Sequence, residues 1–141
     1  MSINRTIWAL VLWASLLPAS YAADNEAPHP TAADQLHLSE AVICEGLENF
    51  KPINASVVFS VRIGSVMCFT EFDRVPRETS IFHDWIRQDK LIFRKKLVLK
   101  PPNWSSVSSI QLREADKGPW RVEIRDADEN LLRTLRFSIT D

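Results

Sequence analysis

The sequence has no apolar run long enough to cross a membrane as a helix. The longest, residues 7–17, has about 11 residues, whereas a membrane span needs about 20. The run follows Arg5 and precedes the small residues of Ser20-Tyr21-Ala22, which is the pattern of a secretory signal peptide. We therefore predict that residues 1–22 are cleaved and that the mature chain is periplasmic or secreted. No stable membrane span is expected after cleavage.

An excess of positive charge is also lacking. Without Arg5 the chain has 16 basic and 18 acidic residues, a balance that argues against nucleic-acid binding. About 119 residues would remain, enough for one compact domain and too few for two. Residues 23–38 contain two prolines among polar residues and are predicted to be a flexible leader. The domain is predicted to cover residues 39–141.

Cysteine is scarce, with Cys44 and Cys68 as the only two. An even number of cysteines in an exported chain predicts a disulfide, here one that closes a loop of about 25 residues. Two buried free thiols are the alternative. No cysteine directly follows the apolar run, so a lipid anchor is not predicted.

The sequence also lacks the ligand spacing of a metal site. His29 and His37 lie in the predicted leader without a cysteine or third histidine nearby. The segment 126–130 resembles a calcium loop but lacks the glycine and the distal glutamate of an EF-hand, so a hairpin turn is predicted there. We predict no metal and no cofactor.

Outside the signal, no segment keeps an apolar helical period for three turns. Short segments alternate apolar and polar residues instead, as strands with one buried face do. This pattern predicts an all-β, immunoglobulin-like antiparallel β-sandwich of about seven or eight strands. The predicted strands cover residues 41–47, 56–63, 66–75, 80–87, 91–100 and 107–112, followed by a hairpin around the turn at residues 126–130.

Several short motifs follow one another in a recognisable order. They are Phe69-Thr70, His83-Asp84-Trp85, Phe93-Arg94-Lys95-Lys96, the serine-rich segment 104–109, Gly118-Pro119-Trp120-Arg121-Val122 and Phe137-Ser138-Ile139. In order and spacing the sequence resembles the bacterial family DUF2914 over roughly residues 40–140. It departs from the family at Pro119, where a polar residue is more usual, and at Ile139, which replaces valine. The resemblance implies a fold, and the family has no assigned activity.

Four residues are candidates for a binding site. His83 and Trp85 lie two positions apart on one strand face, where the indole ring can stack on a sugar or an apolar ligand. Trp104 and Ser108, in the serine-rich segment, are candidates for the wall of a carbohydrate groove. The alternative is that these side chains pack inside the sandwich.

No catalytic residue is predicted. The sequence has no Gly-x-Ser-x-Gly motif, and His83 is the only histidine in the predicted domain. The basic cluster Arg94, Lys95, Lys96 and Lys100 is typical of an edge strand protected against aggregation, and an acidic envelope polymer is its alternative partner.

The sequence therefore predicts an exported, non-catalytic binding or interaction module of the bacterial cell envelope, with a glycan or a protein as its partner. A periplasmic hydrolase of envelope glycan or peptide, with His83 and an acidic residue, is the first alternative. A purely structural accessory subunit is the second.

Overall fold

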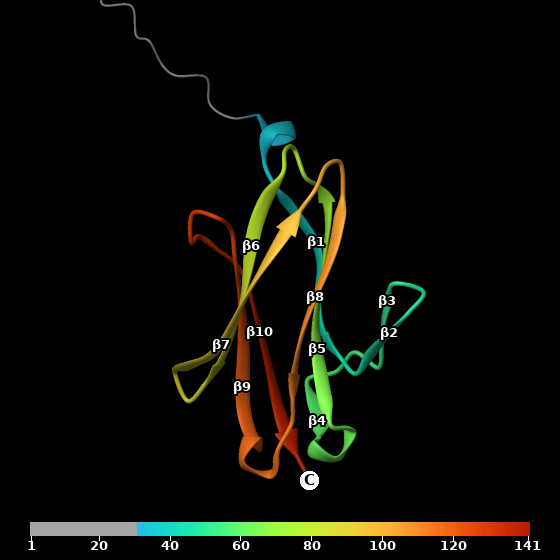
Figure 1. The fold of residues 1–141 in the computed structure, drawn as a ribbon, viewed down its shortest axis with the longest axis vertical. Coiled ribbons are helices and arrows are strands. Elements are labelled where there is room, and N and C mark those ends of the chain that lie inside the picture. The colour runs from blue at the N-terminus through green and yellow to red at the C-terminus, as the bar shows by residue number, and fades with distance from the viewer. Residues whose placement is uncertain (1–30) are drawn as a thin grey trace, which may run out of the picture.

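The computed structural model describes residues 31–141, so the predicted signal peptide and half of the predicted leader lie outside it. The described chain is all-β, with only short 3-10 helices, labelled η, between strands (Figure 1). The elements in chain order are η1 (Ala32–Asp34), β1 (His37–Cys44), β2 (Gly46–Glu48), β3 (Lys51–Ile53), β4 (Val58–Ser60), η2 (Val61–Ile63), β5 (Ser65–Arg74), β6 (Thr79–Arg87), β7 (Lys90–Leu99), β8 (Trp104–Gln111), η3 (Glu114–Asp116), β9 (Gly118–Arg125) and β10 (Leu131–Thr140).

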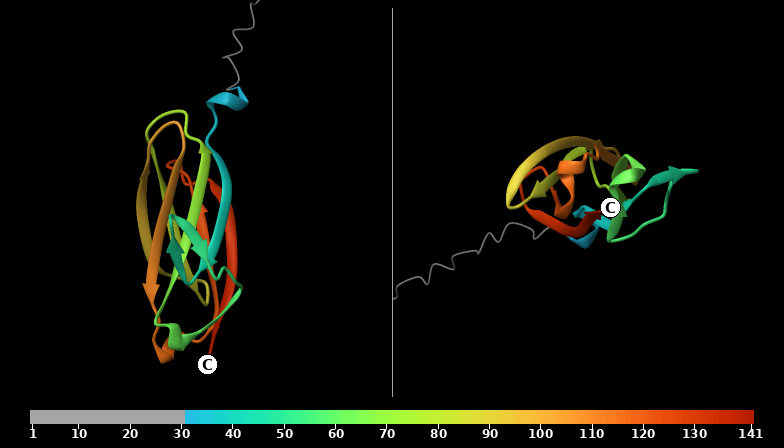
Figure 2. Two further views of the ribbon diagram at one scale, coloured as in Figure 1. Left: turned by 90° about the vertical axis from the view of Figure 1, so that its right-hand side faces the viewer. Right: turned by 90° about the horizontal axis from the view of Figure 1, so that it is seen from below.

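Eight strands form two sheets that pack face to face, which confirms the predicted sandwich. One sheet has the order β1-β5-β8 and the other β4-β10-β9-β6-β7, while β2 and β3 form a separate hairpin. Every pairing is antiparallel except the short one between β4 and β10. The hairpin projects from the body on the side opposite to β7 (Figures 1 and 2).

The division of strands between the sheets is that of the immunoglobulin fold. In that fold the A, B and E strands share one sheet and the C, F and G strands the other. Here β1, β5 and β8 hold the first three places, and β6, β9 and β10 hold the second three. Within residues 31–141 no strand pairs with the free side of β8, and β7 extends the opposite sheet beyond β6.

The core lies between the two sheets and is built from alternate residues of the long strands. Alternation along β5 places Val66, Cys68, Thr70 and Phe72 on one face of the strand, and all four side chains are fully buried. Phe137 of β10 lies at the centre of an aromatic cluster. Its ring centroid is 6.0 Å from that of Trp85, 6.1 Å from that of Phe59 and 6.3 Å from that of Trp120.

The strand predicted over residues 56–63 is mostly absent. Only Val58–Ser60 forms β4, because it pairs with β10 for three residues before the chain turns away. The Ser60 side chain then accepts a hydrogen bond from the backbone N–H of Arg62 and caps η2. Val57, which precedes β4, is 67% exposed, whereas Phe59 within it is buried.

The predicted disulfide is wrong: Cys44 and Cys68 are separate, buried thiols. The register of β1 and β5 explains this, because Ile43 lies opposite Cys68 and Cys44 lies opposite Met67. Adjacent residues of a strand point to opposite faces. Cys68 therefore points into the sandwich while Cys44 points away from it. Burial raises the pKa of both thiols.

No helix in residues 31–141 is long and apolar enough to cross a bilayer.

Candidate functional site

Three of the four predicted binding residues meet inside the sandwich. His83 and Trp85 lie on β6 and Ser108 lies on β8, in the opposite sheet. The Ser108 hydroxyl oxygen is 2.8 Å from Nδ1 of His83 and 3.0 Å from Nε1 of Trp85. Both ring side chains have 0% of their surface exposed. These residues therefore link the two sheets and cannot form a binding surface.

Thr70 of β5 completes this buried group. Its hydroxyl oxygen is 3.3 Å from Nε2 of His83 and 3.4 Å from the backbone carbonyl of Ser106. One arrangement of protons uses every donor. Trp85 N–H donates to Ser108, Ser108 O–H to His83 Nδ1, His83 Nε2–H to Thr70, and Thr70 O–H to the carbonyl. We call Thr70, His83, Trp85 and Ser108 the buried network.

The buried network favours a neutral histidine. Burial lowers the pKa of His83 to about 4, although the nearby charge of Asp84 acts in the opposite direction. The Asp84 carboxylate is held on the other side of β6, where Arg94 Nε and Nη2 donate to it at 2.6 and 2.7 Å. His83 is thus within hydrogen-bond distance of a serine but has no carboxylate partner and no access to substrate. The geometry gives no support to the alternative hydrolase.

Trp104 lies apart from the other candidates. It begins β8 opposite Phe72 and is 39% exposed. Because Trp85 is buried, the two tryptophans do not share one surface. Of these two rings, Trp104 alone is accessible for stacking on a ligand.

On the outer face of the five-stranded sheet, carboxylates neutralise Arg94 of β7. Arg94 binds Glu129 at 2.9 Å in addition to Asp84, and its guanidinium lies 4.6 Å from the ring centroid of Phe82. Its carboxylate partners raise the pKa of Arg94. Arg94, a member of the predicted basic cluster, therefore has a structural role and is not free to bind an anion.

The remaining members of the basic cluster lie on a free sheet edge. Among the strands of residues 31–141, β7 is the last of its sheet and pairs only with β6, which confirms the predicted edge strand. We call residues 90–99 the β7 edge. Four of its apolar side chains are exposed to between 39% and 50%: Leu91, Ile92, Phe93 and Val98. A ten-residue free strand with this much exposed apolar surface is unusual in a monomeric protein.

The family model of DUF2914, "protein of unknown function", matches residues 78–139. Over these residues the chain resembles the DUF2914 family, as the sequence motifs predicted. The matched segment starts just before β6 and includes all four candidate binding residues and the β7 edge. The wider resemblance, which began near residue 40, is matched only in this part. No curated protein matches the chain.

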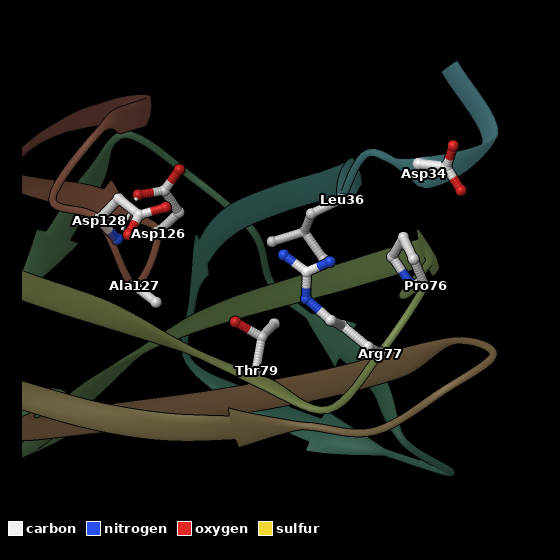
Figure 3. Close-up of a pocket in the computed structure, with 8 residues that line it drawn as sticks. All are labelled: Asp34, Leu36, Pro76, Arg77, Thr79, Asp126, Ala127 and Asp128. Carbon is white, nitrogen blue, oxygen red and sulfur yellow. Dashed lines mark hydrogen bonds between the residues drawn. The ribbon is translucent and has the colours of Figure 1, made fainter. Parts of the chain in front are cut away.

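A small cavity lies at one end of the sandwich, and residues of the matched segment form part of its lining (Figure 3). Its volume is about 170 Å³, and Arg77, Asp126 and Asp128 contribute charges of both signs. The Asp126 carboxylate accepts hydrogen bonds from the backbone of Asp128 and Asn130, so the calcium-like segment is a hairpin turn. Within residues 31–141 no three metal-binding side chains come together.

Two features of the domain were not predicted from the sequence. Thr70 belongs to the buried network, and its position in an otherwise apolar stripe was the available signal. The exposure of the β7 edge was missed because apolar residues in a strand are assumed to face a core. The two prolines after residue 100 and the adjoining lysines were the signals that this strand lies at an edge.

Proposed function

We propose that this protein is a non-catalytic interaction module of the bacterial cell envelope and that it binds a protein partner through the β7 edge. The observation that carries the proposal is the exposed apolar surface of this free strand. Every second residue of an edge strand has a backbone N–H and C=O that point away from its sheet. A partner strand can pair with these groups and cover the apolar side chains at the same time.

A protein partner fits the geometry better than a glycan or a peptide substrate does. Glycan binding was predicted to need Trp85 and Trp104 on one surface, and Trp85 is buried. Hydrolysis needs His83 in contact with substrate, and His83 is sealed between the sheets. The β7 edge needs neither residue.

The envelope location is part of the proposal and is supported by the signal-peptide pattern of residues 1–22. N-terminal sequencing of the protein isolated from its native bacterium tests it. We expect the chain to start at Ala23 and to fractionate with the periplasm or the medium. A chain that starts at Met1 in the cytoplasm would overturn this part of the proposal.

Position-specific photo-crosslinking in living cells tests the binding surface. A photoreactive residue is placed at Leu91 or Val98 on the β7 edge and, as a matched exposed control, at Arg136 on β10. We expect a discrete crosslinked protein from both β7 positions and none from the control. The proposal fails if β7 gives no crosslink or if Arg136 gives the same product.

A further inference from the structure

The β7 edge carries positive charge that nothing in the described chain neutralises. Lys90, Lys95 and Lys96 lie on the strand, and Lys100 follows it. Within residues 31–141 none of these lysines forms an ion pair, whereas Arg94 between them forms two. The residues opposite them on β6 do not compensate: Arg87 lies opposite Lys90, and Phe82 lies opposite Lys96.

The two central lysines point to opposite faces of the sheet. Lys95 lies opposite the buried His83, on the inner face, and Lys96 lies opposite Phe82, on the outer face. A strand added to this edge would thus meet an ammonium group on each of its faces at neighbouring positions. Only acidic side chains at both positions would neutralise them.

Apolar residues flank this central pair on both sides. Leu91, Ile92 and Phe93 precede the basic residues, and Leu97 and Val98 follow them. After Lys90 the edge is therefore apolar, then basic, then apolar along its length. Side chains directly opposite each other on paired strands are in contact, so the sequence of the edge constrains the sequence of its partner.

A second copy of this chain does not meet that requirement. Two β7 edges paired antiparallel around a two-fold axis would place the basic centre of one against the basic centre of the other. Like charges directly opposite each other destabilise a strand pair. The complement of the edge is thus a different segment.

We propose that the partner of the β7 edge is an extended protein segment with two adjacent acidic residues between two apolar blocks. The inference rests on the proposed function of this edge and adds the chemistry of the partner. It requires both charge and order, because acidic residues placed on either side of the central pair would lie opposite apolar side chains such as Leu91 and Val98.

Labelled decapeptides and the purified protein test the inference by fluorescence anisotropy at low salt. The probe is Thr-Val-Thr-Val-Glu-Glu-Val-Thr-Val-Thr. One comparison peptide has Lys-Lys at its centre. In another, the two glutamates exchange places with the outermost valines, so that they face the apolar residues on either side of Lys95 and Lys96. We expect the first peptide to bind about tenfold more tightly than the other two, since neither of these forms the two ion pairs with Lys95 and Lys96. Equal binding of the rearranged peptide would overturn the inference.

Charge reversal provides the matched variants. Lys95→Glu/Lys96→Glu is expected to exchange the preference, so that the Lys-Lys peptide binds about tenfold more tightly. Arg133→Glu/Arg136→Glu makes the same change in net charge on exposed residues of β10 and is expected to leave the preference unaltered. Loss of binding in both variants would show a general anion-binding surface and overturn the inference.

Hydrogen exchange and sedimentation locate the contact. The acidic peptide is expected to slow amide exchange in residues 90–99, and protection elsewhere would contradict strand addition. A dimer of the free protein held through β7 would overturn the inference in favour of a second copy. If β7 crosslinks a partner in cells but shows no acidic preference, the partner's chemistry is wrong and the proposed function stands. If no crosslink forms, the proposed function itself fails.

Discussion

The interior of this sandwich and its β7 edge reverse the usual distribution of side chains. The interior holds a histidine, a serine and a threonine between two sheets, and the edge exposes a phenylalanine and three aliphatic residues. In the interior each polar group is satisfied by another, so burial is tolerated. At the edge, apolar side chains lie beside unpaired backbone groups and unpaired lysines.

The comparison separates residues that stabilise the fold from residues that are available to a partner. The buried network resembles an active site in composition but contributes to stability and sheet alignment. The β7 edge resembles a core strand in composition, but within it only Leu99 is fully buried in the core, with Leu97 packed against the core. Four experiments test this distinction, in decreasing order of the expected change in stability.

Replacing the two tryptophans of the predicted site should give the largest difference in stability. Trp85→Ala removes a fully buried ring and its hydrogen bond to Ser108, and we expect a loss of about 4 kcal/mol in the free energy of unfolding. Trp104→Ala removes a ring that is 39% exposed, and we expect a loss of about 1 kcal/mol. Urea denaturation measures both. Equal losses would mean that Trp104 is also a core residue.

The buried network should make stability depend on pH. Because the pKa of His83 is lowered to about 4 in the folded protein, the unfolded chain binds a proton more readily between about pH 6.5 and 4. Stability should therefore fall as the pH falls through this window, by about 3 kcal/mol in all. It should then show no further loss from this histidine below pH 4.

His83→Gln provides the control for the pH dependence. Whatever its absolute stability, its urea midpoint should change less with pH between about 6.5 and 4.5, above the range in which most carboxylates titrate. An unaltered pH dependence in this variant would show that His83 is not the group responsible.

Much of the fold could be predicted because its strands are long and its turns local. The face of β5 and the two hairpins β6-β7 and β9-β10 follow from alternation and from the polar residues between the strands. β4 was overestimated because its three residues are strands only through pairing with β10. The disulfide was predicted from cysteine count alone, whereas the register of β1 and β5 decides that Cys44 and Cys68 diverge.

The candidate site was predicted as a group but with the wrong role. His83, Trp85 and Ser108 do come together, yet alternation could not show which face of β6 was buried, because Phe82 and Ile86 on its other face are also apolar. Burial depends on what the opposite sheet covers, and that is a property of the whole fold. The same reason hid the exposure of the β7 edge.

Substitutions of two adjacent serines on β8 test whether the hydrogen bonds of the buried network contribute to stability. Ser108→Ala would leave Nδ1 of His83 and the N–H of Trp85 without partners, and we expect a loss of about 2 kcal/mol. Ser109→Ala, one residue further on an exposed position, should change stability by less than about 0.5 kcal/mol. If the two variants unfold at the same urea concentration, the hydrogen bonds of Ser108 contribute nothing measurable.

The β7 edge should give the smallest change in stability and the largest in binding. Leu91→Thr/Val98→Thr keeps two strand-compatible residues at positions that are 50% and 47% exposed. The free energy of unfolding, measured by urea denaturation, should therefore change by less than about 0.5 kcal/mol. The same variant, carrying a photoreactive residue at Ile92, should lose most of its crosslinked partner in cells. A large loss of stability would instead identify these side chains as part of the core, and the contrast between interior and edge would disappear. A stable variant that crosslinks as strongly as the wild type would show that the exposed apolar surface of β7 does not hold the partner.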